Sequence, residues 1–296
     1  MSSTLLFSFV IGYFVLLLIV AWITSRNSNN ESFFIGNRKS NWMLVAFGMI
    51  GTSLSGVTFV SVPGTVGGSG FGYFQVVIGY LMGYMVIAYV LLPLYYKMNL
   101  TSIYNYLQHR FGMVSYKTGA LFFIISRVLG ATARLFLVIN VMQLFILDKM
   151  GVSFEVATFI ILLMILLYTI EGGVKTIVFT DTLQTTFMLL GLVVCIIFIL
   201  QNSGYTMGEA FAEMGKRDYT RVFNTDPNSS SFWLKHILGG AFIAIGMTGL
   251  DQEMMQKNIS VKTLKDSQKN ILTFSAIMAI VNFLFLLPLT YRFLHI

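Results

Sequence analysis

The sequence predicts an all-α membrane protein, and three observations lead to this class. Apolar residues make up 56% of the 296 residues, charged residues only 10%, and the mean hydropathy is +0.78. Soluble domains carry about 25% charged residues. The apolar residues gather in runs of about 20, the length that a helix needs to cross the hydrocarbon core of a bilayer. We therefore expect a single transmembrane domain over residues 1–296, embedded in a lipid bilayer.

Eight apolar runs are present, and each predicts a membrane-spanning helix. Their approximate ranges are 4–24, 43–66, 71–97, 119–147, 153–171, 174–200, 232–255 and 270–296. The first run is read as an uncleaved helix, because "MSSTLLFSFV" lacks the basic start of a signal peptide and "AWITSRN" offers no cleavage site. After the sixth run, Thr206 and Glu209 have the spacing of a capping box, which predicts a short helix outside the membrane.

The net charge of +7 reflects membrane topology and does not indicate a nucleic-acid partner, because the basic residues lie in short loops between the apolar runs. Alternate loops carry eleven and six Lys and Arg residues. This bias predicts a multi-pass protein of the cell (inner) membrane with its amino terminus outside. The larger set is Arg26, Arg38, Lys39, Lys97, Arg110, Lys117, Lys175, Lys257, Lys262, Lys265 and Lys269; the smaller is Lys149, Lys216, Arg217, Arg221, Lys235 and Arg292.

The second run contains an unusual stretch, "GTSLSGVTFVSVPG", in which seven of fourteen residues are Gly, Ser or Pro. Small residues let membrane helices pack closely, whereas a broken helix exposes carbonyls and hydroxyls to a cavity. The density of such residues favours the broken helix. A second stretch, "ILGGAFIAIGMTGLDQ", is loosened by four glycines and lies five helices later. That offset is expected for two inverted five-helix repeats.

Four stretches resemble the sodium:solute symporter family: "ESFFIGNRKSNWMLVAFGMIGTSLSGVTFVSVPG", "LTSIYNYLQHRFG", "EGGVKTIVFTDTLQT" and "GLDQEMMQKNIS". The resemblance implies a leucine-transporter-like inverted five-helix repeat preceded by one extra helix. The extra helix would be 4–24, the first repeat 43–200, and the start of a second, truncated repeat 232–296.

The resemblance also implies a sodium site. In the family, backbone carbonyls from the broken first core helix bind Na⁺, at positions that match Gly51 and Leu54. The other ligands are hydroxyls from the eighth core helix, beyond Ile296. We therefore expect a fragment of a longer carrier, with a natural truncation as the alternative.

Asp181 is a second candidate for binding a cation, because a carboxylate inside the membrane is costly unless it has a partner. Thr180, Thr182 and Thr185 surround it in sequence. Family members link this position to a second sodium ion or to the sodium exit path. The alternative is a salt bridge from Asp181 to Arg127 or Lys175 that fixes helix packing.

The candidate solute ligands are hydroxyls, one amide and one arginine. Ser53, Ser55 and Thr58 match positions that look toward substrate in relatives, although such hydroxyls also bond to their own helix. Gln75 is the only amide of the third span and serves either the solute or helix packing. Arg134 lies at mid-membrane depth with no acid in its own helix. In sialic acid carriers of the family, an arginine on this helix holds the substrate carboxylate.

Arg127, two turns before Arg134, is expected to extend toward the cytoplasmic side or to pair with Asp181. The seventh span departs from the sugar carriers by placing Ala244 and Met247 where those carriers have polar and aromatic residues, which argues against a hexose.

The favoured function is a sodium-coupled symporter that imports a small carboxylate by alternating access. The alternative is a non-transporting sensor or input domain of the same fold. An enzyme is not expected, because His109, His236 and His295 are far apart and no cluster has metal-ligand spacing. The sequence specifies neither the solute nor an oligomeric state.

Overall fold

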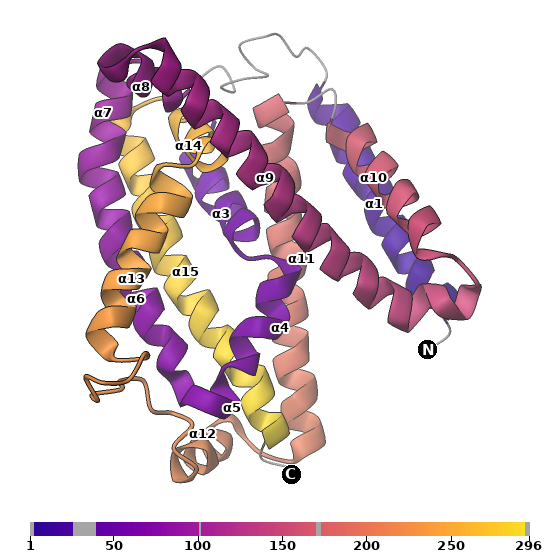
Figure 1. Ribbon diagram of the computed structural model, residues 1–296. Coiled ribbons are helices and arrows are strands. Elements are labelled where there is room, and N and C mark those ends of the chain that lie inside the picture. The colour runs from indigo at the N-terminus through magenta and orange to yellow at the C-terminus, as the bar shows by residue number, and fades with distance from the viewer. Residues whose placement is uncertain (1–2, 26–39, 101, 170–172, 294–296) are drawn as a thin grey trace.

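The computed structural model describes residues 3–25, 40–100, 102–169 and 173–293, and these fold into a helical bundle (Figure 1). One isolated β-bridge joins Ser40 to Val261. Residues 31–39, 101 and 171–172 of the family-like stretches lie outside the described residues, as do residues 170–171 at the end of the fifth predicted span and 294–296 at the end of the eighth.

Most of the α-helices follow the predicted apolar runs, whereas α8 and α12 lie between runs. They are α1 (Ser3–Ser25), α3 (Trp42–Ser53), α4 (Gly56–Gly64), α5 (Val66–Ser69), α6 (Tyr73–Val86), α7 (Leu92–Lys97), α8 (Tyr104–Phe111), α9 (Met113–Met142), α10 (Phe154–Thr169), α11 (Gly173–Ser203), α12 (Met207–Lys216), α13 (Trp233–Ala244), α14 (Gln252–Ile259) and α15 (Leu264–Phe293). Short 3₁₀ or π-helical turns join some of them: η2 (Gly70–Gly72), η3 (Ile87–Leu91), η4 (Gln143–Leu147), η5 (Asp148–Met150) and η6 (Ile245–Gly249).

Five described helical stretches are long and apolar enough to cross a membrane, and a sixth is a bent pair formed by Trp233–Gly249 and Gln252–Ile259. Two further apolar helices are shorter, Trp42–Ser53 and Phe154–Leu167. The eight predicted runs therefore correspond to helices, but the second run divides into α3 and α4, and the seventh bends where α14 begins.

The core lies where α15 packs against α3, α6 and α11, with α11 also packed against α3 and α13 covering α6 (Figure 1). Phe274 and Phe285 of α15 are fully buried there, and their rings contact Tyr84 and Phe59 edge-on. Aromatic pairs in this geometry add to the packing beyond the area they bury.

Small residues allow α6 and α13 to approach unusually closely. A Cβ atom built on Gly79 would lie 2.1 Å from the Ile237 carbonyl, and one on Gly240 would lie 2.2 Å from the Val76 carbonyl. Because real Cβ atoms do not come so near, only glycine fits at these two positions. Such close crossings are typical of membrane helices, whose association depends on van der Waals packing.

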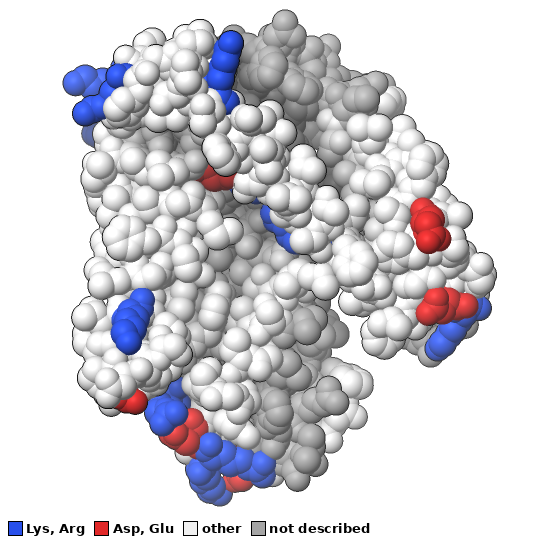
Figure 2. Space-filling model, viewed as in Figure 1, with Lys and Arg blue, Asp and Glu red and all other residues white. Residues whose placement is uncertain are grey.

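A smaller cluster joins α1, the end of α9 and α10 on one side of the bundle (Figure 1). Ile139 and Leu147 are its most buried members. The predicted short helix and its capping box are confirmed as α12: the Thr206 hydroxyl accepts from the Glu209 amide, and the Glu209 carboxylate accepts from the Thr206 amide. Figure 2 shows charged residues gathered mainly at the ends of the molecule, with a hollow in the middle of the visible face.

Candidate functional site

The break between α3 and α4 frees two carbonyls that a continuous helix would use. In a helix the Ser55 amide would bond to the Gly51 carbonyl, but here it donates to the Thr58 hydroxyl at 3.1 Å. The Thr58 amide would bond to Leu54 and instead donates to the Ser55 carbonyl at 2.9 Å. The two carbonyls expected to bind sodium have thus lost their helical donors.

Gly51 packs directly against Thr185 of α11. Its amide donates to the Thr185 hydroxyl at 2.9 Å, and that hydroxyl donates to the Asp181 carbonyl at 2.8 Å. A Cβ on Gly51 would lie 2.5 Å from the Thr185 oxygen. The glycine is therefore required by packing against α11.

The seventh span is also broken, with its two halves bent by 68°. The π-helical turn η6 ends at Gly249, whose carbonyl accepts a hydrogen bond from the Tyr95 hydroxyl at 2.8 Å. Helix α14 then begins with Asp251 as its cap, whose carboxylate accepts from the Met254 amide at 3.0 Å. The glycine-rich pair of stretches predicted to interrupt two helices does so in both cases.

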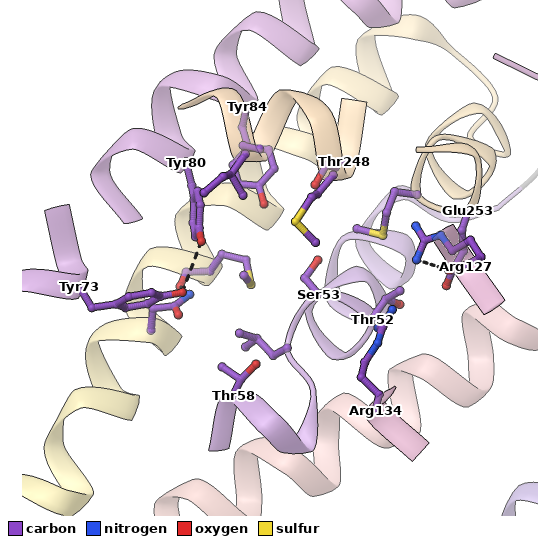
Figure 3. Close-up of a pocket in the computed structure, with 17 residues that line it drawn as sticks. Thr52, Ser53, Thr58, Tyr73, Tyr80, Tyr84, Arg127, Arg134, Thr248 and Glu253 are labelled. Carbon is purple, nitrogen blue, oxygen red and sulfur yellow. Dashed lines mark hydrogen bonds and ion pairs between the residues drawn. The ribbon is translucent and has the colours of Figure 1, made fainter. Parts of the chain in front are cut away.

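A cavity of about 160 Å³ lies between the two breaks (Figure 3). Its lining comes from the α3–α4 break, one face of α6, the arginines of α9, the second break and α15. The residues are Thr52, Ser53, Leu54, Thr58, Tyr73, Tyr80, Tyr84, Arg127, Arg134, Ile243, Ala244, Met247, Thr248, Glu253, Met254, Met278 and Asn282.

The predicted solute ligands divide into two groups. Ser53, Thr58 and Arg134 line the cavity, and Ser55 is not among its lining residues. Gln75 lies elsewhere: it is fully buried and its amide donates to the Gly72 carbonyl at 3.0 Å. Its side-chain oxygen accepts from the Asn224 amide at 3.4 Å, so its observed contacts are structural and join α6 to the segment before α13.

Arg134 and Arg127 have different surroundings. The Arg134 Nε donates to the Gly130 carbonyl of its own helix, at 3.1 Å. Arg127 forms ion pairs with Asp251 and with Glu253, the latter at 3.3 Å. The expected pairing of Arg127 with Asp181 is therefore wrong, because α14 presents its acids to α9 directly after the second break.

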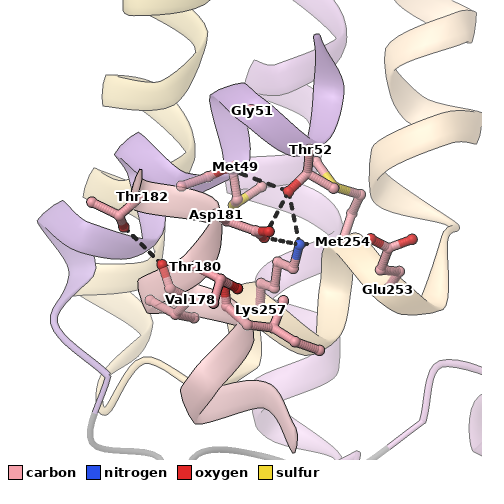
Figure 4. Close-up of polar contacts among 12 residues, drawn as sticks. Met49, Gly51, Thr52, Val178, Thr180, Asp181, Thr182, Glu253, Met254 and Lys257 are labelled. Atoms are coloured by element: carbon pink, nitrogen blue, oxygen red, sulfur yellow. Dashed lines mark hydrogen bonds and ion pairs between the residues drawn. The ribbon is translucent and has the colours of Figure 1, made fainter. Parts of the chain in front are cut away.

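Asp181 pairs with Lys257 of α14 and not with Arg127, whereas the side chain of Lys175, the other expected partner, lies outside the described residues (Figure 4). The Lys257 Nζ lies 2.6 Å from the Asp181 Oδ2, and the Thr52 hydroxyl donates to the same oxygen at 2.9 Å. The charge count places Lys257 in a loop, but its side chain is inside the bundle and the residue is only 4% exposed.

The three threonines near Asp181 do not surround its carboxylate. Thr180 bonds to the backbone of its own helix, Thr182 to the Val178 carbonyl at 2.7 Å, and Thr185 to the Asp181 carbonyl. The hydroxyl that reaches the carboxylate is that of Thr52, from α3.

Comparisons with known proteins identify the family of this chain. A profile of the sodium:solute symporter family matches residues 33–293. The chain belongs to the sodium:solute symporter family. This symporter-family chain is 26% identical to the human sodium/iodide cotransporter over 270 residues, covering 88% of the chain and 41% of that protein. It is 27% identical to mouse sodium-coupled monocarboxylate transporter 2, covering 82% of the chain and 39% of that protein.

Comparison with solved structures gives the same fold. A solved Na⁺-coupled sialic acid symporter, in a substrate-bound, outward-open state, superposes with a TM-score of 0.86 at 22% identity. The match covers 98% of this chain and 61% of that one. The chain spans about two fifths of the length of the curated relatives. The family and these relatives are transporters and not enzymes.

Proposed function

We propose that the chain is part of a sodium-coupled symporter that imports a small organic carboxylate by alternating access. Its fold would be the leucine-transporter-like inverted repeat of five helices. The observation that carries the proposal is that two broken helices, five spans apart in sequence, border one cavity. Broken helices that face each other across the membrane midplane are the usual site of solute and ion in secondary transporters.

The backbone at the first break supports sodium as the coupling ion. The Gly51 and Leu54 carbonyls have lost their helical donors and are free to accept a cation. Hard cations favour oxygen ligands such as these. In this proposal Na⁺ binds at the end of α3, next to the cavity that Leu54 and Ser53 line.

The chemistry of the cavity supports a carboxylate solute. Among the described residues, Arg134 is the cavity cation without an acidic partner, whereas Arg127 is held by two acids. A guanidinium binds a carboxylate through two parallel hydrogen bonds. Ser53 and Thr58 offer hydroxyls to the rest of the solute, and Ala244 and Met247 give the second break an apolar surface toward the cavity.

The test is solute uptake into liposomes that contain the purified symporter of which this chain is part. Lactate, pyruvate, sialic acid, proline and glucose are each supplied in sodium and in potassium buffer. We expect sodium-dependent uptake of a carboxylate. Arg134→Lys keeps the charge but loses the paired hydrogen bonds, so affinity should fall; Arg134→Ala should lower it by about 30-fold or more, because losing one partner of a desolvated charge pair costs about 2 to 5 kcal/mol.

Two results would contradict the proposal. Equal uptake in sodium and potassium buffers would contradict the proposed sodium coupling. Glucose uptake undiminished by Arg134→Ala would contradict both the proposed carboxylate solute and the role of Arg134 as its anchor. Sodium-dependent solute binding without uptake would favour the sensor alternative instead.

A further inference from the structure

Lys257 is a charged side chain held inside the bundle by oxygen atoms from two other helices. Its Nζ lies 2.6 Å from the Asp181 carboxylate of α11 and 2.8 Å from the Thr52 hydroxyl of α3 (Figure 4). A third oxygen, from Glu253, lies 3.6 Å away. Two of the three ammonium donors therefore have hydrogen-bond acceptors, and Glu253 adds an ion pair from the same helix.

The atoms around this ammonium are those that a small metal cation would also choose. Carboxylate and hydroxyl oxygens are preferred ligands of hard cations, and a lysine ammonium is a compact point charge. Thr52 adjoins Gly51, whose carbonyl is proposed to bind Na⁺, so the ammonium occupies a neighbouring group of oxygens. Lysine is almost never buried without a partner, which indicates that the pair with Asp181 holds it here.

We propose that Lys257 is a tethered cation that occupies the oxygens of Asp181 and Thr52 and competes with dissolved Na⁺ for them. Its presence limits the number of sodium ions that the chain binds. The inference rests on the proposed sodium coupling only in naming Na⁺ as the competitor. Removing the ammonium would leave Asp181 buried without a counter-charge, a state that must be relieved by uptake of a cation or a proton.

The experiment replaces the tethered charge and counts bound sodium. Lys257→Met removes the ammonium, Lys257→Arg keeps the charge as a matched control, and Lys257→Met combined with Asp181→Asn removes both charges. Each purified protein is measured for equilibrium binding of radioactive ²²Na⁺ and for its melting temperature in sodium chloride against choline chloride. A mildly alkaline buffer disfavours protonation of Asp181.

We expect Lys257→Met to bind an additional Na⁺ per chain and to gain a sodium-specific rise in melting temperature. Lys257→Arg should match the original protein, and the double variant should lose the gain. A folded Lys257→Met protein with unchanged sodium binding, or an equal gain in the double variant, would overturn the inference.

The experiment also distinguishes a failure of this inference from a failure of the variant to fold and from a failure of the proposed sodium coupling. If Lys257→Met does not fold, Lys257→Gln tests the same point, because its amide can still donate to Asp181 or Thr52 without a charge. The basal sodium binding of the original protein reports on sodium coupling, whereas the difference between the original protein and the variant reports on Lys257. A gain in the variant supports the inference even where the original protein binds no sodium.

Discussion

Gly51 has two properties that bear on the proposed sodium site. Its carbonyl has lost its helical donor, and its Cα packs against α11. We expect Gly51→Leu to push α3 away from Thr185 and to raise the sodium concentration needed for half-maximal uptake. Gly64 lies in the same stretch, and a Cβ atom added there would have no neighbour within 4 Å, so Gly64→Leu is the matched control. The measurement is uptake against sodium concentration; equal effects of both changes would contradict this role for Gly51.

Replacement of the two arginines of α9 should have different effects, one on stability and the other on solute binding. Arg127→Ala leaves the largely buried Asp251 without its partner, and breaking a buried pair costs about 3 to 5 kcal/mol, reduced here because the Arg127 side chain is 30% exposed. Its melting temperature should therefore fall. Arg134→Ala should leave the melting temperature unchanged and weaken solute binding. Thermal unfolding and solute binding of both variants check the contrast, and loss of stability in Arg134→Ala alone would refute it.

At the scale of helices, the crossing of α6 and α13 gives a sharp comparison. Gly240→Ala would place a methyl group 2.2 Å from the Val76 carbonyl, and overpacking of this kind costs about 1 to 3 kcal/mol. A Cβ atom on its neighbour Gly239 would have nothing within 4 Å, so Gly239→Ala should be neutral or slightly stabilising. Melting temperatures in detergent test this, and similar losses in both variants would show that the close crossing is not what matters.

Helix α12 should depend on pH through its cap. Hydrogen bonds from the Thr206 amide and hydroxyl lower the pKa of Glu209. A lowered pKa in the folded state means that the cap stabilises α12 above the ordinary glutamate pKa and that this stability is lost as pH falls through the lowered value. Hydrogen exchange of the α12 amides, corrected for the intrinsic effect of pH, should speed up on acidification. Thr206→Ala should weaken that dependence.

Both helix breaks could be predicted, because Gly and Ser are dense at one and glycines recur at the other. The ion pairs could not, since "QEMMQKN" reads as a polar segment that leaves the membrane. A usable signal was present: Glu253 and Lys257 are one turn apart, and Met254, Met255 and Ile259 give that turn a buried apolar side. The spacing of Tyr73, Tyr80 and Tyr84 likewise places them on one face of α6, toward the cavity.

For the molecule as a whole, the charge bias predicts an amino terminus outside the cell. Lys257 is buried, but leaving it out of the count of loop Lys and Arg residues still leaves the larger number on the predicted cytoplasmic side. With Cys195 replaced by Ser, we expect Asn228→Cys to react with a membrane-impermeant maleimide on intact cells and Lys117→Cys to react only after permeabilisation. Both positions are exposed and lie at loops or helix ends. The reverse labelling pattern would invert the topology.

The short helix α14 and its cap Asp251 form ion pairs with α9 through Arg127 and with α11 through Asp181. Glu253 lies 3.3 Å from Arg127, which lines the cavity between the two helix breaks, and 3.6 Å from Lys257, which pairs with Asp181. Because the contacts with Arg127 and with Asp181 belong to one short helix, a rotation of α14 changes both contacts together. The free energies of the two contacts are therefore coupled. Thermodynamic linkage then requires reciprocity: whatever factor the solute contributes to cation affinity by moving α14, the cation returns to solute affinity.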